Sequence, residues 1–537
     1  MNAPKHRLRA RPSHGEVRRP RWLTNDSDMA SFLDDAAHTP GGHTSAVALP
    51  TTEGEVVSAL RHSRRMLPVG AQSSLTGGAT PLGEAVLSLS RMNAMGPITA
   101  DSVRVEPGVA IETIEAALAA RGLCYPPAST YRGASLGGSV ATNAAGASTF
   151  KHGTTRLWVN ALTVVLADGD VLEIERGAVR ASDDGAFEIE GVDGRVARVV
   201  VPPYAMPEVP KCSAGYYAAQ GMDLIDLFIG AEGTLGVVTS IELRLIPARP
   251  TLLGWMTCAS ETQALAFVAR LREESRRTWA DGDPYGIDVA AIESLDRRSL
   301  ALLREDGIDS KEATPIPSDV DTVLLFQLEL APGTNEAQVS AALASADAPD
   351  APDSAMRRLV RVASESDVLD RIELALPGDA RRAAQLFAVR EAVPEAVNRR
   401  IGAGQLAHGP EVRKTAGDMV VPFSALGEMM TRYRDALGSR ELDYAIWGHV
   451  SDGNLHVNVI PRSASETRSG EDALLKLGAA AIALGGSPLA EHGVGRNPIK
   501  QRLLRQLYGD SGIAAMRRVK AALDPEWKLA PGVIFTR

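Results

Sequence analysis

The sequence predicts an α+β protein with two domains. A chain of 537 residues is longer than a single hydrophobic core normally serves. Strand-like and helix-like segments are mixed over the first 248 residues, and Pro247 and Pro250 then interrupt that pattern. Amphipathic helices with fewer strands follow. We therefore expect a basic, disordered arm over residues 1–40, one domain over 41–248 and a second domain over 249–537.

Local signals predict the elements in chain order. Residues 47–65 should form a strand and then a helix, because Thr52 is a suitable N-cap, acids fill the first turn and arginines the last. In the first domain we also expect strands at 66–69, 86–89, 103–105 and 237–246, a helix at 111–121 and a hairpin at 162–175. In the second we expect a strand at 322–330, a loop at 346–353, and helices at 383–400 and 471–484.

Composition excludes several classes of protein. With 45% hydrophobic and 23% charged residues the chain has the make-up of a soluble globular protein, and a net charge of −9 argues against a general nucleic-acid binder. No apolar run reaches the roughly 18 residues of a membrane span. Cys124, Cys212 and Cys258 lie far apart, which predicts neither disulfides nor an iron–sulfur cluster. We expect a cytoplasmic protein, with a peripheral place at the inner membrane as the alternative.

Three loops rich in small residues lie in the first domain, at 70–78, 133–148 and 230–236. Each lies beside a predicted strand. Such loops let the backbone approach a large ligand and expose N–H groups that can hold a pyrophosphate. Ordinary tight turns are the alternative interpretation.

Other motifs are weaker. No GxxxxGK[ST] sequence occurs, and the dinucleotide-like pattern at 402–407 follows a predicted helix rather than a strand. Residues 133–137 fit the GxSxG pattern of hydrolases, but lack the expected strand-to-helix flanks. A metal-binding or hydrolytic protein without flavin therefore stays open as an alternative at this point.

A histidine pair near the C-terminal end predicts a metal site. Asp-Gly at 452–453 predicts a two-residue turn, which would place His449 directly opposite His456. Opposed Cβ atoms lie about 4.5–5.5 Å apart, so both imidazoles could reach one ion. Strand alternation puts Asn458 on the same face as His456. Glu491 is the candidate third ligand, and two buried core histidines are the alternative.

Five ordered motifs then resemble one family. They are residues 68–78, 137–146, 228–236, 449–458 and 491–493. Over residues 45–535 the chain resembles the flavin-dependent 2-hydroxy-acid dehydrogenases of the vanillyl-alcohol-oxidase (p-cresol methylhydroxylase) type. That group includes D-lactate dehydrogenases, D-2-hydroxyglutarate dehydrogenases and the flavin subunit of glycolate oxidase.

The resemblance implies a vanillyl-alcohol-oxidase-type flavoprotein, with an FAD-binding domain and an α+β substrate domain. It implies a divalent metal, expected to be zinc, on His449, His456 and Glu491, and His492 as the catalytic base. Arg390, Lys414 and Asn458 would contact the substrate. Noncovalent FAD would be held by Pro68, Val69, Gly70, Ala71, Gln72, Ser73, Ser74, Leu75, Gly137, Gly138, Ser139, Ala141, Thr142, Asn143, Gly146, Glu232, Gly233, Gly236 and Val238.

The sequence departs from the family pattern in three places. Residues 71–74 replace a run of glycines, which puts the flavin contacts of that loop in doubt. Pro394 stands where 2-hydroxyglutarate enzymes have a hydroxyl residue, which weakens that substrate assignment. His152 precedes Gly153 where an aromatic residue is usual, and we do not expect a histidyl–flavin bond there.

The expected reaction is oxidation of a small D-2-hydroxy acid, such as D-lactate, to the 2-oxo acid. The metal would favour ionisation of the 2-hydroxyl, as zinc lowers the pKa of bound water from about 15.7 to about 7. His492 would remove the proton, and hydride would pass to flavin N5. The expected partner is an electron acceptor: a cytochrome, a quinone or an electron-transfer flavoprotein. A homodimer is also considered.

Several alternatives to this reaction remain. The substrate could instead be D-2-hydroxyglutarate, or the chain could be a glycolate oxidase flavin subunit. Two alternatives belong to other functional classes. The chain could be an FAD transferase similar to alkyl-dihydroxyacetone-phosphate synthase, or a non-catalytic electron-transfer subunit.

Overall fold

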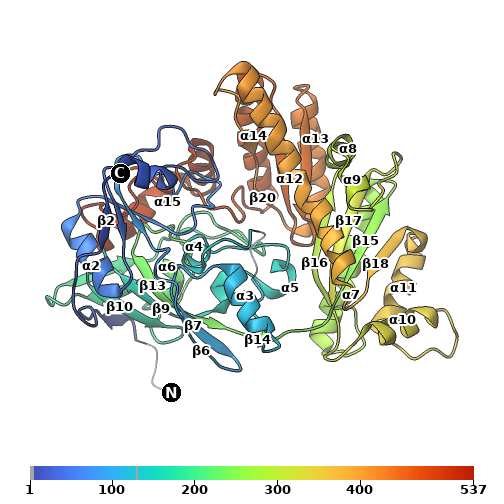
Figure 1. Cartoon of the computed structure of the whole chain (residues 1–537), viewed down its shortest axis with the longest axis horizontal. Coiled ribbons are helices and arrows are strands. Elements are labelled where there is room, and N and C mark those ends of the chain that lie inside the picture. The colour runs from blue at the N-terminus through green and yellow to red at the C-terminus, as the bar shows by residue number, and fades with distance from the viewer. Residues whose placement is uncertain (1–4, 128–130) are drawn as a thin grey trace. The chain divides into compact units, whose positions relative to one another are not determined.

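The computed structural model describes residues 5–127 and 131–537, and the chain divides into two compact units. Unit 1 is formed from residues 1–146, 153–248 and 489–537. Unit 2 is formed from residues 147–152 and 249–488. The elements are labelled along the chain in Figure 1. The sequence-based division differs from this one in two places, since residues 489–537 belong to the first unit and residues 147–152 to the second.

A small sheet in unit 1 takes the strand order β2-β3-β5-β4. Strands β3 and β4 both pair parallel with β5, so helix α2 crosses between them as the sequence predicted. The Thr52 side chain caps α2 by accepting from the Glu55 N–H. The bounds are β2 Arg21–Leu23, β3 Val47–Leu49, α2 Glu53–His62, β4 Met66–Val69 and β5 Ala85–Ser88.

A larger sheet in unit 1 takes the order β10-β9-β13-β7-β6, with antiparallel neighbours throughout. The predicted hairpin at 162–175 is the pair β9–β10. The bounds are β6 Met95–Ile98, β7 Ser102–Val105, β9 Val159–Val165, β10 Val171–Glu175 and β13 Val237–Arg244, with helices α3 Ile111–Ala119, α4 Leu136–Thr142, α6 Ile225–Phe228 and α15 Pro498–Leu523.

The C-terminal residues complete unit 1 because they pair with its N-terminal strands. Leu529 forms a parallel bridge with Met66 of β4. The buried Lys528 ammonium donates to the carbonyls of Leu60, at 3.0 Å, and Ala167, at 2.8 Å. These contacts join segments that are more than 360 positions apart in the chain.

The N-terminal arm is ordered where the structure describes it, so the expectation of disorder is wrong for residues 5–40. Strand β1 (Arg7–Arg9) pairs parallel with β11 (Ala186–Glu190), which in turn pairs with β12 (Val196–Val200). Arg11 forms a two-pronged hydrogen bond with the Glu53 carboxylate, both contacts being 2.9 Å. The arm is ordered because its basic side chains find acidic partners in the folded unit.

Unit 2 is built on one sheet of order β18-β15-β17-β16-β21-β22-β19. Helix α12 packs on the face that carries Leu325, within one hydrophobic core cluster of the unit. Helix α7 packs on the opposite face, where Phe267 lies 6.1 Å from Phe326. The strands are β15 Thr251–Cys258, β16 Val289–Leu295, β17 Thr322–Glu329, β18 Ile372–Ala375, β19 Thr415–Ala416, β20 Met419–Val420, β21 Tyr444–His449 and β22 Asn454–Val459.

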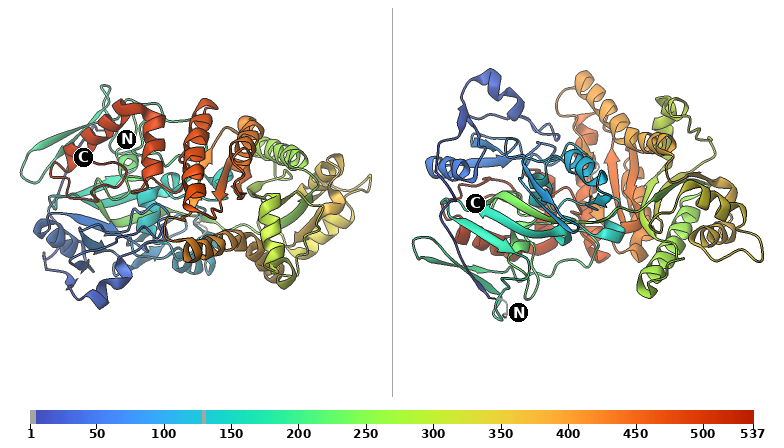
Figure 2. Two further views of the ribbon diagram at one scale, coloured as in Figure 1. Left: turned by 90° about the horizontal axis from the view of Figure 1, so that it is seen from above. Right: turned by 60° about the horizontal axis from the view of Figure 1, so that its bottom comes forward.

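Helices cover both faces of this sheet, as the further views in Figure 2 show. The predicted helices at 383–400 and 471–484 fall within α12 and α14. The helices of unit 2 include α5 Thr149–His152, α7 Glu261–Asp281, α8 Arg297–Glu305, α10 Glu336–Ala344, α11 Ala355–Glu365, α12 Ala380–His408, α13 Leu426–Gly438 and α14 Ala464–Ala483.

Residues 147–152 join unit 2 through charged contacts. Lys151 Nζ lies 2.8 Å from Asp288 and 2.5 Å from Glu329, and His152 Nε2 lies 2.6 Å from the other oxygen of Glu329. The Phe150 ring lies 5.0 Å from that of Trp279. These partners explain why this short segment leaves the unit that surrounds it in sequence.

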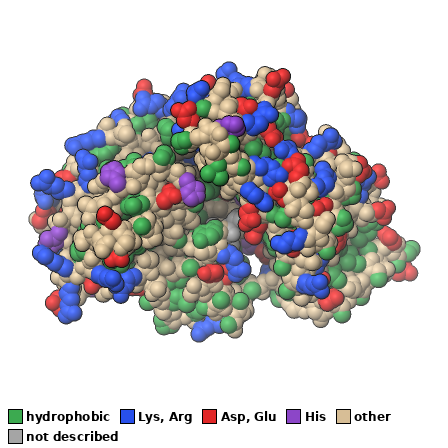
Figure 3. Space-filling view, turned by 45° about the horizontal axis from the view of Figure 1, so that its top comes forward, with side chains coloured by type: hydrophobic (Ala, Val, Ile, Leu, Met, Phe, Trp, Pro, Cys, Tyr) green, Lys and Arg blue, Asp and Glu red, His purple; other side chains and the backbone are tan. Residues whose placement is uncertain are grey.

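Charged side chains of both signs are interspersed on the face drawn in Figure 3. In the described part of the chain, no helix is both long and apolar enough to span a membrane.

Candidate active site

The structure places the predicted site residues in two groups, one in each unit. Unit 1 contains a cavity of about 290 Å³ that all three small-residue loops line. Glu491 and His492 line the same cavity. Of the predicted cofactor-binding residues, those on its wall are Pro68, Val69, Gly70, Ala71, Gln72, Ser73, Ser74, Leu75, Gly137, Gly138, Ser139, Ala141, Thr142, Glu232, Gly233, Gly236 and Val238.

Asn143 and Gly146 are not among the residues that line the cavity. Asn143 ends helix α4 in the left-handed conformation, with φ 49°, and its side chain accepts from the Arg156 N–H at 2.9 Å. Ser135 caps the start of α4 by accepting from the Gly138 N–H, so the GxSxG motif serves as a helix cap here. The pattern at 402–407 lies inside helix α12 and forms no loop.

Close packing explains the glycines of these loops. A Cβ at Gly70 would lie 2.2 Å from the Ser135 hydroxyl, and one at Gly137 would lie 2.5 Å from Pro107. A Cβ at Gly138 would meet only the Ser135 hydroxyl, at 3.1 Å, so the missing side chain there leaves room in the cavity. The wall therefore exposes backbone, which suits the pyrophosphate and ring system of a flavin dinucleotide.

Residues 489–495 form a segment that three side chains of unit 1 hold in place. The Lys211 ammonium donates to the Glu491 carboxylate at 2.8 Å, and both side chains are buried. Ser213 Oγ accepts from the Gly493 N–H at 3.0 Å. Glu232 accepts from the Val494 and Gly495 N–H groups, both at 2.8 Å. Residues 489–495 are called the 489–495 segment below.

Glu232 links the cavity wall to this segment. Its backbone is in the left-handed region, with φ 50°, and its side chain lines the cavity. Burial raises the pKa of the Glu232 carboxyl to about 7, against the lowering effect of the two backbone N–H groups and the charge of Lys500. The sequence suggested only a flavin contact for this residue.

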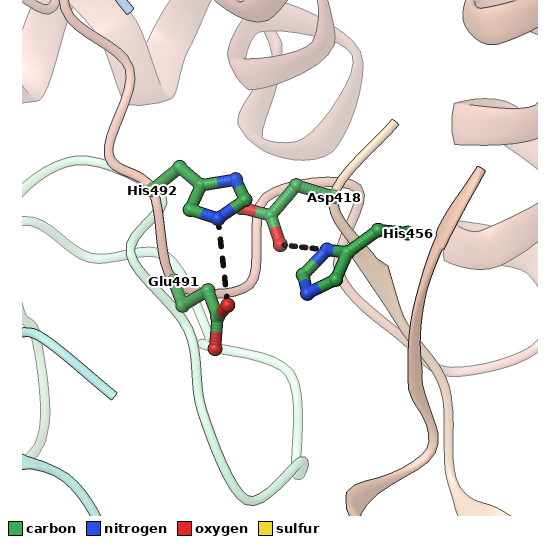
Figure 4. A group of neighbouring side chains, drawn as sticks. All are labelled: Asp418, His456, Glu491 and His492. Carbon is green, nitrogen blue, oxygen red and sulfur yellow. Dashed lines mark ion pairs between the residues drawn. The ribbon is translucent and has the colours of Figure 1, made fainter. Parts of the chain in front are cut away.

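Figure 4 shows the side chains of Glu491 and His492. His492 Nε2 lies 3.4 Å from Glu491 Oε1. The His492 side chain is 28% exposed, whereas that of Glu491 is 7% exposed. His492 is therefore the more accessible of the two at the cavity wall, as proton exchange with a ligand would require.

The histidine hairpin of unit 2 differs from the predicted one. His449 lies opposite Asn454, and His456 lies opposite Trp447, so the two-residue turn is wrong. Residues 450–452 form a 3₁₀ turn instead, which Gly453 ends with φ 76°. The longer connection makes the two histidines diagonal neighbours on one sheet face. Their ring centroids still lie 5.4 Å apart, with the rings nearly perpendicular.

A buried glutamate joins two of the predicted residues. Glu293 on β16 lies directly opposite His449, and Oε1 lies 2.6 Å from His449 Nδ1. The other oxygen accepts from Arg390 Nε and Nη2, at 3.2 and 3.1 Å. Burial opposes ionisation of Glu293, but Arg390 and His449 outweigh it and hold the pKa of this carboxyl well below its usual range.

Asp418 adds a carboxylate beside the second histidine, as Figure 4 also shows. Its Oδ1 lies 3.6 Å from His456 Nδ1 and accepts from the Asn454 side chain at 3.4 Å. It lies in the link between β19 and β20 and is 2% exposed. Each of Asp418, His456, Glu491 and His492 offers an atom that can bind a divalent metal ion.

The donor types in unit 2 fit such an ion. Imidazoles and carboxylates are the ligands that zinc prefers in proteins alongside thiolates. Glu293 engages Nδ1 of His449, so a metal would bind Nε2 of that ring. Asn458 lies two residues beyond His456 on strand β22. Its side-chain amide donates to the His456 backbone carbonyl at 3.2 Å.

Lys414 differs from Arg390 in its surroundings. Its side chain is exposed, yet the protein around the ammonium group lowers its pKa to about 8 by desolvation. Among the described residues Lys414 has no hydrogen bond or ion pair, whereas Arg390 is paired with Glu293. Pro394 lies within helix α12, four residues beyond Arg390.

Sequence reasoning missed Lys211, Glu293 and Asp418. Glu293 gave a signal, since it is a lone carboxylate in the otherwise apolar strand 289–295. Lys211 lies 280 residues from its partner Glu491, and no local pattern connects them. Asp418 follows a glycine in an irregular stretch and forms no recognisable motif.

Known families match both parts of the chain. A model described as "FAD binding domain" matches residues 44–175, and one described as "FAD linked oxidases, C-terminal domain" matches residues 280–534. D-2-hydroxyglutarate dehydrogenase of Xanthomonas citri pv. viticola is 29% identical over 96% of this chain and 94% of the relative. D-lactate dehydrogenase of Anaerostipes hadrus is 26% identical over 97% and 95%.

Solved structures agree on the fold. 4-Ethylphenol oxidase from Gulosibacter chungangensis superposes with a TM-score of 0.62 at 16% identity, over 96% of this chain and 94% of that chain. This likeness confirms the two-domain fold of vanillyl-alcohol-oxidase-type flavoproteins. The chain belongs to the FAD-linked oxidases, in the family that includes the D-lactate and D-2-hydroxyglutarate dehydrogenases, and it is an FAD-dependent oxidoreductase.

Proposed function

We propose that this protein oxidises a small D-2-hydroxy acid, such as D-lactate, to the corresponding 2-oxo acid. The observation that carries the proposal is the cavity of unit 1, whose wall includes the three small-residue loops together with Glu491 and His492. A flavin site and a candidate base thus share one cavity. Bound FAD supplies the hydride acceptor for such a reaction.

His492 is the proposed base that takes the proton from the substrate hydroxyl. Imidazole suits this role near neutral pH, and the His492 side chain is more exposed than that of its neighbour Glu491. Lys211, Ser213 and Glu232 hold the 489–495 segment that carries it. The proposed metal is divalent, with zinc as the expected identity. It would favour the ionised hydroxyl.

His449 and His456 are proposed to bind this metal, and Glu491 stays the predicted third ligand. Lys414 and Arg390 are proposed to bind the substrate carboxylate, with Asn458 as a further contact. Glu293 offsets the charge of Arg390, which leaves Lys414 as the cation without an acidic partner among the described residues.

The test is anaerobic bleaching of the purified, flavin-loaded protein. We expect D-lactate to bleach the flavin absorbance near 450 nm, and L-lactate, D-2-hydroxyglutarate and glycolate to do so at least about tenfold more slowly, a difference of about 1.4 kcal/mol in the barrier. His492→Ala should keep its flavin and lose bleaching. Protein that binds no FAD, or that no 2-hydroxy acid bleaches, would contradict the proposal.

A further inference from the structure

Glu293 occupies an unusual place among the residues of unit 2. It is 5% exposed and lies on β16, in a strand whose other side chains are apolar apart from Ser294. The register places it directly across from His449 on β21. Arg390 reaches the same carboxylate from helix α12, which covers this face of the sheet.

Each oxygen of Glu293 has its own partner. Oε1 lies 2.6 Å from His449 Nδ1, and Oε2 accepts from Arg390 Nε and Nη2. An ionised carboxylate only accepts hydrogen bonds, so His449 must carry its proton on Nδ1. The lone pair of a neutral His449 is then on Nε2, the nitrogen through which this ring would bind a metal.

The same carboxylate fixes Arg390. Two of the three guanidinium nitrogens bind Glu293, and Nη1 takes no part in the pair. Because a guanidinium is planar, fixing two nitrogens also fixes the third. A single buried group thereby sets the orientation of two residues from different elements.

We propose that Glu293 is the positioning residue of this site, which holds His449 as an Nε2 metal ligand and Arg390 as the carboxylate-binding group. This inference rests on the proposed function, since it presupposes that His449 binds a metal. It adds a residue that neither the motifs nor the family resemblance indicated.

The simpler explanation is that Glu293 only balances the charge of Arg390. The chain offers a matched control for that explanation, because Glu373 on β18 pairs with Arg382 on the same helix α12. That pair also joins a strand of the sheet to α12, but among the described residues no histidine is hydrogen-bonded to it. Glu293→Gln and Glu373→Gln therefore each remove one ion pair between the sheet and α12, although the Glu373 side chain is 48% exposed and that of Glu293 is 7% exposed.

The measurement is a titration of Co²⁺ into metal-stripped, flavin-loaded protein, followed by its visible absorption bands. We expect Glu293→Gln to weaken Co²⁺ binding roughly 10–100-fold, the usual effect of losing a carboxylate behind a histidine ligand. Glu373→Gln should bind Co²⁺ within about twofold of the parent. Circular dichroism and thermal melting of the same samples report whether each variant is folded, since the substitutions lie in unit 2 and the flavin cavity lies in unit 1.

Two results would overturn the inference: Co²⁺ affinity unchanged in Glu293→Gln, or a parent protein that binds no Co²⁺. If Glu293→Gln yields no folded protein, Glu293→Asp takes its place. The shorter side chain keeps the charge but cannot span both partners, so the same weakening is expected. The titration uses no substrate, so a failed reaction in the bleaching test stays distinguishable from a failure here.

Discussion

Lys211 shows how a single residue can stabilise a buried carboxylate. Its side chain is fully buried and its ammonium lies 2.8 Å from Glu491. In metal-free protein, Lys211→Met should lower the free energy of unfolding by about 3–5 kcal/mol, because it removes the buried cation that is paired with the Glu491 carboxylate. Denaturant unfolding of the parent and the variant measures the difference.

The double variant Lys211→Met/Glu491→Gln is the control, since it removes both charges. We expect it to recover most of the loss. Equal destabilisation in the single and double variants would show that the Lys211 methylenes, rather than its charge, stabilise the segment.

The raised pKa of Glu232 predicts that the free energy of unfolding depends on pH. Its pKa of about 7 in the folded protein exceeds its ordinary value of 4.5, so the folded state binds this proton more tightly. The resulting stability is complete below about pH 4.5 and is lost as the pH rises to about 7. Relative to Glu232→Gln, the flavin-free parent should lose about 2–3 kcal/mol between pH 5 and pH 8.

Denaturant unfolding of both proteins at the two pH values measures this loss, and pH-independent effects of the substitution cancel in the comparison. A difference between the two proteins that stays constant from pH 5 to pH 8 would contradict the raised pKa.

Candidate site residues that lie in local motifs could be proposed from the sequence, whereas the residues that contact them in the folded chain could not. The spacing of His449 and His456 indicated a shared face, and the small-residue loops indicated a large ligand. Lys211, Glu293 and Asp418 meet their partners only through tertiary folding. Pairing between positions as far apart as 280 residues leaves no trace in a single sequence.

At the scale of elements, the histidine hairpin depends on Gly453. Its φ of 76° is costly for other residues, and a Cβ there would lie 2.1 Å from the Val421 carbonyl oxygen. Gly453→Ala should therefore cost at least about 1–3 kcal/mol and lower the melting temperature. It should also reduce the Co²⁺ bound per chain, because β21 and β22 carry both histidines.

Gly438→Ala at the end of α13 is the matched control, since nothing lies within 4 Å of the added Cβ. It should leave melting and Co²⁺ binding unchanged or slightly improved. Identical behaviour of the two alanine variants would mean that the turn adapts without cost.

The same hairpin shows what pattern-based prediction misses in an element. The Asp-Gly pair correctly indicated a reversal of the chain between two strands. The register was wrong because Val450 to Asp452 coil into a 3₁₀ turn, and the Ser451 hydroxyl accepts from the Ile292 N–H on the next strand. A contact to a third strand outweighed the preference of the dipeptide.

At the scale of the whole molecule, Lys528 connects the C-terminal residues of unit 1 to its N-terminal part. Its ammonium donates to the carbonyls of Leu60 and Ala167, which belong to the N-terminal part of the unit. Lys528→Met would remove the ammonium donor from both carbonyls, of which that of Leu60 keeps the Ser63 N–H at 3.4 Å, and the loss should be about 1–3 kcal/mol. Denaturant unfolding measures it, with the exposed Lys476→Met as the control; equal midpoints would contradict the role.

At the whole-molecule scale, the sequence predicted the two-domain α+β class but not the return of the C-terminal residues to unit 1. The change of composition after Pro247 follows from local sequence. The bridge between Met66 and Leu529 does not, because neither flanking segment has a pattern that specifies a distant partner.

That bridge has a consequence for synthesis on the ribosome. The chain emerges from its N-terminus, so the strands around Met66 leave the exit tunnel long before Leu529 has been made. Unit 2 has all of its residues once position 488 is complete, whereas unit 1 still lacks residues 489–537. Domains generally fold as units during translation. Unit 1 therefore begins to be synthesised first but can complete its fold only after unit 2, and we expect FAD to bind after synthesis of the chain is complete.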